Sequence, residues 1–362
     1  MSFMKILVIE AAGLHLGYVG CYGNDWIATP NLDRLAVQGI VFDWHFADQP
    51  ELAITTPWHE RSIGTGCYAF PGSPPLVGEL PLTPRIVRCE KLTRFGADAL
   101  QAVKANDRWL WLEGPSLLPP WDLEAEMLDA YFDEDDVEEG LAAWNDPPLG
   151  LVNLDEADVL QVQSTYAAAV TVFDAQLGEL LEGMKLTDTL LCLTARAGLP
   201  LGEHGMIGAP RPRLHDELVH VPLLFRLPNK EHAGMRVAGL TQPVDLLPTF
   251  LETLGQPAPV LHGRSLWPLI RGDVQEVRPY AVAALRVDDC ESWLLRSADW
   301  AFHLARGPET PPQLFVKPDD RWEVNNLVQQ QGELADTMSG ALGAFAEAIR
   351  RPGALVYPTI TG

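Results

Sequence analysis

The sequence predicts an α/β fold in which helices cover both faces of a mostly parallel central sheet, with a small antiparallel sheet and a helix at the C-terminal end. Short apolar runs alternate with helical patterns over about the first 275 residues, which is typical of a parallel sheet. Beyond that point, short strand-like runs follow one another with turn residues between them. We therefore expect an α/β domain over residues 1–275 and a C-terminal subdomain over 276–362.

Each element of the first region has its own signal. Buried strands are predicted at four short apolar runs, at residues 6–9, 40–42, 109–112 and 190–193. Thr29 and Pro30 are typical of a helix N-cap and first turn, and Gly39 ends that helix. Apolar residues spaced by three and four from Tyr166 to Leu180 predict a long amphipathic helix that ends near residue 183.

The second region reads as an antiparallel sheet. Its strands are predicted at residues 280–285, 292–296, 300–304 and 313–316, and a final helix at about 333–350. In the first region, an acidic run at residues 133–139 lies between helical patterns. We interpret it as a solvated surface, with a cation-binding patch as the alternative.

Charge and composition exclude several classes of partner. A formal charge of −23 would repel nucleic acid and anionic membranes, so we expect neither as a partner. No run approaches the roughly 20 apolar residues of a membrane span, and the N-terminus lacks the features of a secretory signal. The cysteines are odd in number and scattered, which favours free thiols and a cytoplasmic location: Cys21, Cys67, Cys89, Cys192 and Cys290.

Several motifs, in a fixed order, resemble those of one family. They are GCYGN at 20–24, ATPNLDRLA at 28–36, GIVF at 39–42, LGEHG at 201–205, VPLL at 221–224, VDLLPT at 244–249, GRSL at 263–266 and the segment 313–327. The chain is similar to the sulfatase branch of the alkaline-phosphatase-like superfamily over about residues 5–328. This resemblance implies sulfate-ester hydrolysis with a divalent cation, usually Ca²⁺, and a formylglycine made from Cys or Ser.

The family's metal-binding positions have lost their ligands in this sequence. Aligned on the GCYGN motif, the family's Asp-Asp pair falls on Ala12 and Gly13. The second metal-binding element contains Arg196 in place of an Asp, followed by Ala197. The family's catalytic Lys aligns with Ala209. Glu10 is the nearby carboxylate that remains, two residues before Ala12 and hence on the same strand face.

The position of the nucleophile is also changed. Ungapped alignment places Thr56 there, and a shift of one residue places Thr55 there, so neither alignment offers a Cys or Ser for formylglycine. Thr is the nucleophile in phosphoryl-transferring relatives of the superfamily. The alternative is that Thr56 is a helix N-cap, with His59, Glu60 and Arg61 in the first turn.

Other polar residues of the resembling motifs carry weaker hypotheses. Arg61 is a candidate for lining the old catalytic cleft. His204 is interpreted as structural rather than catalytic. His215 and Asp216 are expected to pack or form a pair near the cleft. The isolated residues His15 and His45 are not expected to be ligands.

The leading functional hypothesis is a pseudoenzyme without formylglycine, Ca²⁺ or other cofactor, which binds a small anion or a protein partner. The alternative is a hydrolase or transferase acting on sulfate or phosphate esters through Thr55 or Thr56. An ordinary sulfatase is disfavoured. We expect Arg196 to pair with Glu10, or else, with Arg61, to hold a bound anion, because an unpaired buried guanidinium is costly.

Overall fold

The computed structural model describes residues 4–52, 56, 58–68, 70, 80–132, 141–151, 153–208, 214–287, 290–306, 310–351 and 353–360. By compactness the chain divides into two units. The first comprises Met1–Val41, Thr83–Ala209 and Val221–Arg236, and the second comprises Phe42–Leu82, Pro210–His220 and Val237–Gly362. The division at residue 275 stays a prediction. Thr55, Ala209 and the acidic run at 133–139 lie outside the described residues.

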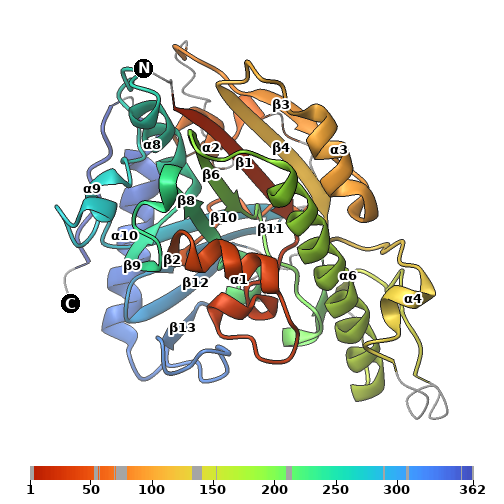
Figure 1. Ribbon diagram of the computed structural model, residues 1–362. Coiled ribbons are helices and arrows are strands. Elements are labelled where there is room, and N and C mark those ends of the chain that lie inside the picture. Colours follow the sequence, from red (N-terminus) through yellow and green to blue (C-terminus); the bar gives the residue numbers. More distant parts are fainter. Residues whose placement is uncertain are drawn as a thin grey trace. The chain divides into compact units, whose positions relative to one another are not determined.

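The main sheet has seven strands, in the order β3-β4-β1-β6-β8-β2-β9 (Figure 1). Their bounds are Arg85–Arg88 (β3), Trp109–Ser116 (β4), Lys5–Ala12 (β1), Thr189–Thr194 (β6), Leu223–Arg226 (β8), Ile40–His45 (β2) and Met235–Thr241 (β9). The first four are mutually parallel, whereas β8 runs antiparallel to both β6 and β2. The predicted fold, a mostly parallel sheet in an α/β protein, is confirmed.

Strand β1 lies in the middle of the parallel part because it is apolar on both faces. Its residues 6–9 are fully buried, as a strand covered on both sides requires. In register, Glu10 lies opposite Glu113 of β4 on one side and Thr194 of β6 on the other. Since paired residues of parallel strands project to the same face, this register determines which side chains meet Glu10.

Three helices of the first unit are α1 (Pro30–Val37), α3 (Phe95–Ala102) and α6 (Glu156–Gly183). The helix predicted from Tyr166 to about 183 is α6. Thr29 occupies the N-cap position of α1, but its side chain does not cap the helix. The carboxylate of Asp174 on α6 does so instead, because it accepts the backbone N–H groups of Asn31 and Leu32.

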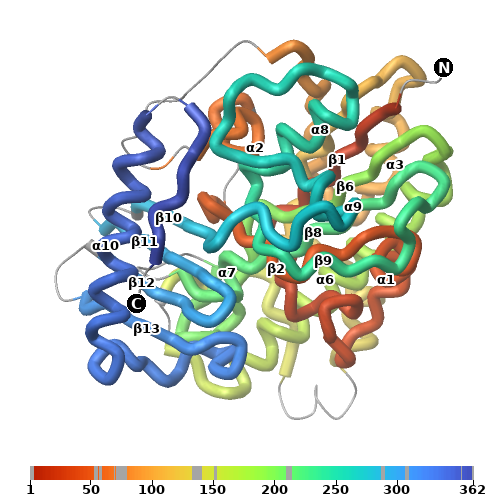
Figure 2. Tube along the Cα trace, turned by 90° about the vertical axis from the view of Figure 1, so that its left-hand side faces the viewer, coloured from red at the N-terminus to blue at the C-terminus, as the bar shows by residue number. Residues whose placement is uncertain are grey.

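The second unit contains the antiparallel sheet, in the order β10-β11-β12-β13. Its strands are Ala281–Val287, Cys290–Arg296, Trp300–Arg306 and Gln313–Val316, close to the predicted ranges. Helix α10 (Gly332–Ala348) runs along this sheet (Figure 2). Its apolar side chains, such as Met338 and Phe345, pack with Leu295 and Phe302 in one buried cluster. The small antiparallel sheet with a terminal helix is confirmed.

The remaining elements are short. The α-helices are Ser62–Thr65 (α2), Ala125–Leu128 (α4), Asp216–Val219 (α7), Leu246–Thr253 (α8) and Trp267–Arg271 (α9), and β5 (Gly150–Leu151) pairs with β7 (Met206–Ile207). The 3₁₀ helices are Leu16–Tyr18, Gly20–Tyr22, Trp58–Glu60, Leu92–Arg94, Glu203–Gly205, Pro228–Lys230 and Pro243–Asp245.

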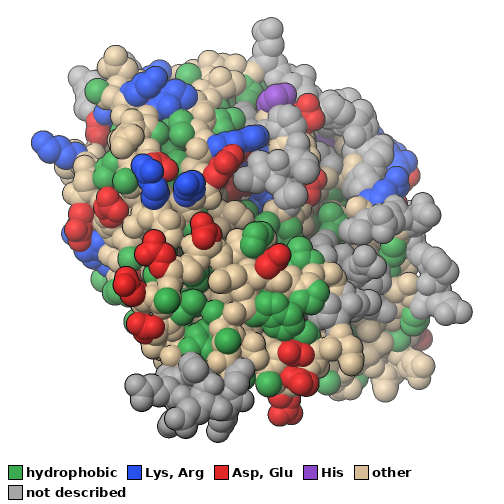
Figure 3. Space-filling view, turned by 90° about the vertical axis from the view of Figure 1, so that its right-hand side faces the viewer, with side chains coloured by type: hydrophobic (Ala, Val, Ile, Leu, Met, Phe, Trp, Pro, Cys, Tyr) green, Lys and Arg blue, Asp and Glu red, His purple; other side chains and the backbone are tan. Residues whose placement is uncertain are grey.

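The charges on the surface and the apolar content of the helices agree with what the composition predicts. On the face drawn in Figure 3, acidic side chains lie among apolar and uncharged ones rather than in a single patch. No helix within the described ranges is both long and apolar enough to cross a membrane. All five cysteines are free thiols.

Candidate functional site

The candidate site lies where β1 and β6 end, in the first unit. The two strands run parallel and in register up to Glu10 and Thr194. Beyond them, the backbone N–H of Gly13 donates a 3.0 Å hydrogen bond to the carbonyl oxygen of Ala197. The family positions at the two strand ends are therefore neighbours in this chain, as the sequence predicts.

Glu10 and Arg196 form a buried ion pair at this place. The Nε of Arg196 donates a 3.0 Å hydrogen bond to Glu10 Oε1, and Nη2 lies 2.9 Å from the same oxygen. The two side chains are 3% and 5% exposed. Charge-assisted contacts of this length between desolvated groups are among the strong ones, and removal of either partner would leave a buried charge.

The second oxygen of Glu10 is held by Trp111. The indole Nε1–H of Trp111, on β4, donates a 2.8 Å hydrogen bond to Glu10 Oε2. Arg196 therefore contacts only one oxygen of the Glu10 carboxylate, so the pair is not bidentate. Both oxygens of Glu10 are occupied by donors from this chain, so the carboxylate is fully engaged within the protein.

A second acidic side chain lies beside the pair. Glu113 of β4 is buried and faces Glu10 in register. It accepts a 3.0 Å hydrogen bond from Nε of Arg88 on β3, whose side chain is 57% exposed. Each carboxylate thus contacts an arginine, and in the row Arg88–Glu113–Glu10–Arg196 two acids lie between two arginines, across three parallel strands and the end of β6.

The backbone at Gly13, which aligns with a metal-binding position of the family, also disfavours a ligand side chain. Gly13 has φ +83°, a left-handed conformation that side chains rarely adopt. A Cβ placed there would come within 2.8 Å of Leu118 Cδ2. An aspartate at this position would therefore be strained and crowded.

The residues at the four aligned metal positions do not fit the divalent cation that the resemblance to sulfatases implies. Of the four positions, Ala12, Gly13 and Ala197 have no side-chain oxygen, and Arg196 brings a positive charge. A hard cation requires several oxygen ligands. No catalytic step through Ca²⁺ is derived for this site.

The loop after β1 is supported by a polar cluster from the same unit. Tyr166 of α6 donates a 2.7 Å hydrogen bond to the Gly13 carbonyl and accepts one from the His15 backbone N–H. His15 Nε2 lies 3.6 Å from Glu203 Oε1. Burial raises the pKa of Glu203, and its contacts with His15 and the Leu201 N–H together lower it below its ordinary value. We interpret this cluster as support for the strand end.

The other predicted site residues lie elsewhere. His204 is exposed and has a left-handed backbone (φ +51°), within the retained LGEHG motif. In the second unit, the hydroxyl of Thr56 donates a 3.1 Å hydrogen bond to Glu51 Oε2. Arg61 is buried and extended at the N-cap of α2, so the prediction that it belongs to a first helical turn begun by Thr56 is wrong.

Sequence reasoning missed Trp111 and Glu113. The run at 109–112 is recognisable as a strand, but its register against β1 is set by packing on both faces and leaves no local signal. Alternation along β4 places Trp111 and Glu113 on one face, and this was the available hint. His215 contacts Glu323, and Asp216 contacts Lys317. Their position near the cleft stays a prediction.

Comparison with solved structures defines the class of fold. The chain superposes on a phosphonate monoester hydrolase of Agrobacterium radiobacter with a TM-score of 0.72 at 17% identity, covering 96% of each chain. It also superposes on a protein solved with its substrate D-glucosamine-2-N,6-O-disulfate, with a TM-score of 0.71 at 17% identity, covering 96% of this chain and 97% of the other. At this identity the likeness shows the fold, which is alkaline-phosphatase-like.

Part of the chain is similar in sequence to sulfatases and related hydrolases. Residues 104–256 match the family model for sulfatases. The chain is 28% identical over 198 residues to the multifunctional alkaline phosphatase superfamily protein PehA of Trinickia caryophylli, covering 48% of this chain. It is 28% identical over 204 residues to arylsulfatase K of Danio rerio, covering 53% of this chain. Each match spans 38% of the relative's length. The family match covers 153 of the 362 residues, less than half of the chain.

Proposed function

We propose that this chain is a non-catalytic member of the sulfatase family with respect to sulfate-ester hydrolysis. The observation that supports this is the buried pair of Glu10 and Arg196, at the strand ends where the family binds its cation. A guanidinium at this place repels a divalent cation and replaces its charge. Unlike a metal ion, a guanidinium has no open coordination position for an ester oxygen. Metal-assisted hydrolysis requires such a position.

The neighbouring backbone supports the same proposal. The left-handed φ of Gly13 and its contact with Leu118 mean that one substitution would not restore a ligand there. At the position of the nucleophile, Thr56 has a secondary hydroxyl, whereas formylglycine is made from the CH₂ group of Cys or Ser. The chemistry of the family's cofactor is thus missing at both places.

The counter-ion of Arg196 is an internal carboxylate rather than an external anion in this proposal. Nε donates to Glu10 Oε1, Nη2 lies 2.9 Å from the same oxygen, and Arg196 is almost fully buried. A small anion or a protein partner therefore remains an expectation for some other surface, and a cytoplasmic location remains a proposal alongside the five free thiols.

Activity and metal binding test the proposal together. The chain is coexpressed with a formylglycine-generating enzyme and assayed with an aryl sulfate, an aryl phosphate and a phosphonate monoester, with and without Ca²⁺ and Mn²⁺. We expect no turnover above buffer, and calorimetry should detect no Ca²⁺ binding that Glu10→Gln changes. Metal-dependent sulfate release, or Ca²⁺ binding lost in Glu10→Gln, would contradict the proposal.

A second candidate function rests on Thr56. Its hydroxyl donates to a carboxylate oxygen of Glu51, an arrangement in which Glu51 can take the proton while Thr56 Oγ1 attacks phosphorus or sulfur and the ester oxygen leaves. This candidate predicts turnover of phosphate or sulfate esters that is lost in both Thr56→Val and Glu51→Gln. Thr253→Val is the matched control, because it removes a hydroxyl that donates to the carbonyl oxygen of Thr249 within α8.

A further inference from the structure

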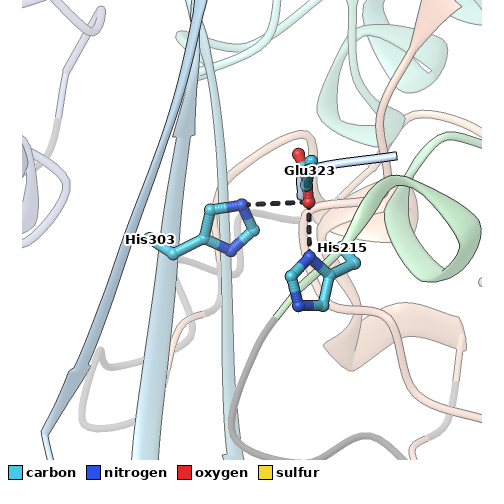
Figure 4. A group of neighbouring side chains, drawn as sticks. All are labelled: His215, His303 and Glu323. Carbon is cyan, nitrogen blue, oxygen red and sulfur yellow. Dashed lines mark hydrogen bonds and ion pairs between the residues drawn. The ribbon is translucent and has the colours of Figure 1, made fainter. Parts of the chain in front are cut away.

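A second buried cluster, in the second unit, gathers metal-ligand side chains. His215 lies directly before α7, His303 is on β12, and Glu323 follows β13. Figure 4 shows both imidazole rings directed at the same oxygen of Glu323. His215 Nδ1 lies 2.5 Å and His303 Nε2 3.3 Å from Glu323 Oε2. All three side chains are at most 6% exposed, and their ligand atoms lie within 4.8 Å of one another.

His303 lacks the hydrogen bonds that a buried imidazole normally makes. Neither ring nitrogen has a partner of good hydrogen-bond geometry, although the side chain is only 2% exposed. Leaving a buried polar atom unsatisfied costs about 1–3 kcal/mol, and such atoms often indicate a water or ion that completes the site. The Nε2 atom faces Glu323, where an ion would lie between them.

Glu323 is held in place as a ligand would be. Its backbone adopts φ +51°, which is uncommon for a residue other than glycine and indicates that the surroundings fix it. Its Oε1 lies 2.9 Å from Nζ of Lys317, which leaves Oε2 for the imidazoles.

We propose that His215 Nδ1, His303 Nε2 and Glu323 Oε2 bind a divalent metal ion of the zinc type, with water as the fourth ligand. Two imidazoles and one carboxylate are a common ligand set for zinc. Tetrahedral ligands at about 2.1 Å from the ion lie about 3.4 Å from one another. The distance from His303 to Glu323 already matches this, and the distance from His215 to Glu323 must widen by less than about 1 Å.

The charges around the cluster indicate which interactions would drive metal binding. Lys317 also contacts Asp216 at 2.9 Å, and Arg296 interacts electrostatically with Asp216, Glu323 and Asp299. Three acids against two cationic side chains leave an excess of one negative charge, so the net field that attracts the ion is weak. Affinity must come from the imidazole nitrogens, which favours Zn²⁺ or Co²⁺ over Ca²⁺ and Mg²⁺. The competing account is a metal-free network of ion pairs.

The test uses the full chain, stripped of metal by a chelator and titrated with Zn²⁺, Co²⁺ and Ca²⁺. We expect one Zn²⁺ per chain by calorimetry, the intense visible absorption of tetrahedral Co²⁺, and no Ca²⁺ binding. His303→Gln and Glu323→Gln should each weaken Zn²⁺ binding more than about tenfold. His59→Gln is the matched control, because His59 is exposed beside Glu60 and could bind ions adventitiously.

Each outcome decides the proposal. A tetrahedral Co²⁺ spectrum in the wild-type chain, lost in His303→Gln but kept in His59→Gln, supports it. If His303→Gln does not fold, the wild-type spectrum and stoichiometry still decide. Absence of a stoichiometric ion, an octahedral Co²⁺ spectrum, or binding lost in His59→Gln alone would overturn the site and leave the network of ion pairs.

Discussion

The two buried clusters each centre on one glutamate, and they differ in how that glutamate is satisfied. Glu10 lies on a regular strand, with one oxygen held by Arg196 and the other by Trp111. Glu323 lies in a turn with left-handed backbone, with one oxygen near Lys317 and the other shared by two imidazoles. The first has a permanent cation as its main partner, and the second has partners that can exchange a proton for a metal.

This difference separates a closed site from an open one. An arginine stays protonated at any physiological pH, so the pair of Glu10 and Arg196 needs no further ion. An imidazole can be a donor, an acceptor or a ligand, depending on what it meets. The closed ion pair in the first unit therefore gives no reason to expect a metal-free second unit.

The largest expected effect tests whether the first cluster is a closed pair. Glu10→Gln keeps the shape of the side chain but removes the carboxylate charge that the buried Arg196 guanidinium contacts. We expect a loss of about 3–5 kcal/mol in the free energy of unfolding, measured by urea denaturation. The double variant Glu10→Gln/Arg196→Met should recover most of this loss, and a double-mutant cycle gives the coupling. A cost below about 1 kcal/mol for Glu10→Gln would show that Arg196 has another anion.

The next effect concerns the second oxygen of Glu10. Trp111→Phe removes the indole N–H that donates to Oε2 while keeping an aromatic ring in the sheet. Loss of a hydrogen bond to a charged group should cost about 1.5–3 kcal/mol in the same assay. Trp121→Phe is the control, because Trp121 is also buried but donates to the neutral carbonyl of Leu117, and a smaller cost is expected there. Equal costs would mean that the charge of Glu10 does not matter.

Acid sensitivity should come from the second unit rather than from the first cluster, which has no histidine. Burial, with the charges of Arg278 and His220, lowers the pKa of His45 to about 3. The unfolded chain takes up this proton first, near pH 6.5. The free energy of unfolding should therefore fall as the pH falls from about 6.5 towards 3, by up to about 1.4 kcal/mol per pH unit.

His45→Gln isolates this contribution. Gln preserves a hydrogen-bonding group for Thr241, the partner of His45 Nδ1, and cannot take up a proton. Denaturation at several pH values should give a flatter profile for this variant. The slope that remains reports the other titratable groups of the chain. A profile identical to that of the wild type would remove His45 as a source of acid sensitivity.

The sequence predicts the regular elements well and the contacts between distant segments poorly. Periodicity and family motifs were sufficient to place β1, β6 and α6, and hence to bring Arg196 to Glu10. The partners of Glu10 on β4 depend on strand register, and the cap of α1 comes from Asp174, which is 145 positions beyond Thr29 in the sequence. The joining of His303 to Glu323 depends on a turn conformation. Such contacts are fixed by tertiary packing and leave little trace in local sequence.

The smallest effect is expected for the neighbouring ion pair, Arg88 and Glu113, in the same row of charged side chains. Arg88 and Glu113 have the same chemistry as Arg196 and Glu10, and lie in register with them, but the Arg88 side chain is 57% exposed. Water can solvate the arginine and approach the carboxylate once the arginine is gone, so Arg88→Ala should cost less than about 1 kcal/mol and depend on salt. Arg196→Ala, in the same sheet, should cost several times more and show little dependence on salt, because its partner has no access to water. Urea denaturation of both variants at low and high salt gives the comparison directly. Equal costs for the two arginines would mean that burial does not distinguish the pairs, and the Glu10–Arg196 pair would then be an ordinary ion pair at a strand end.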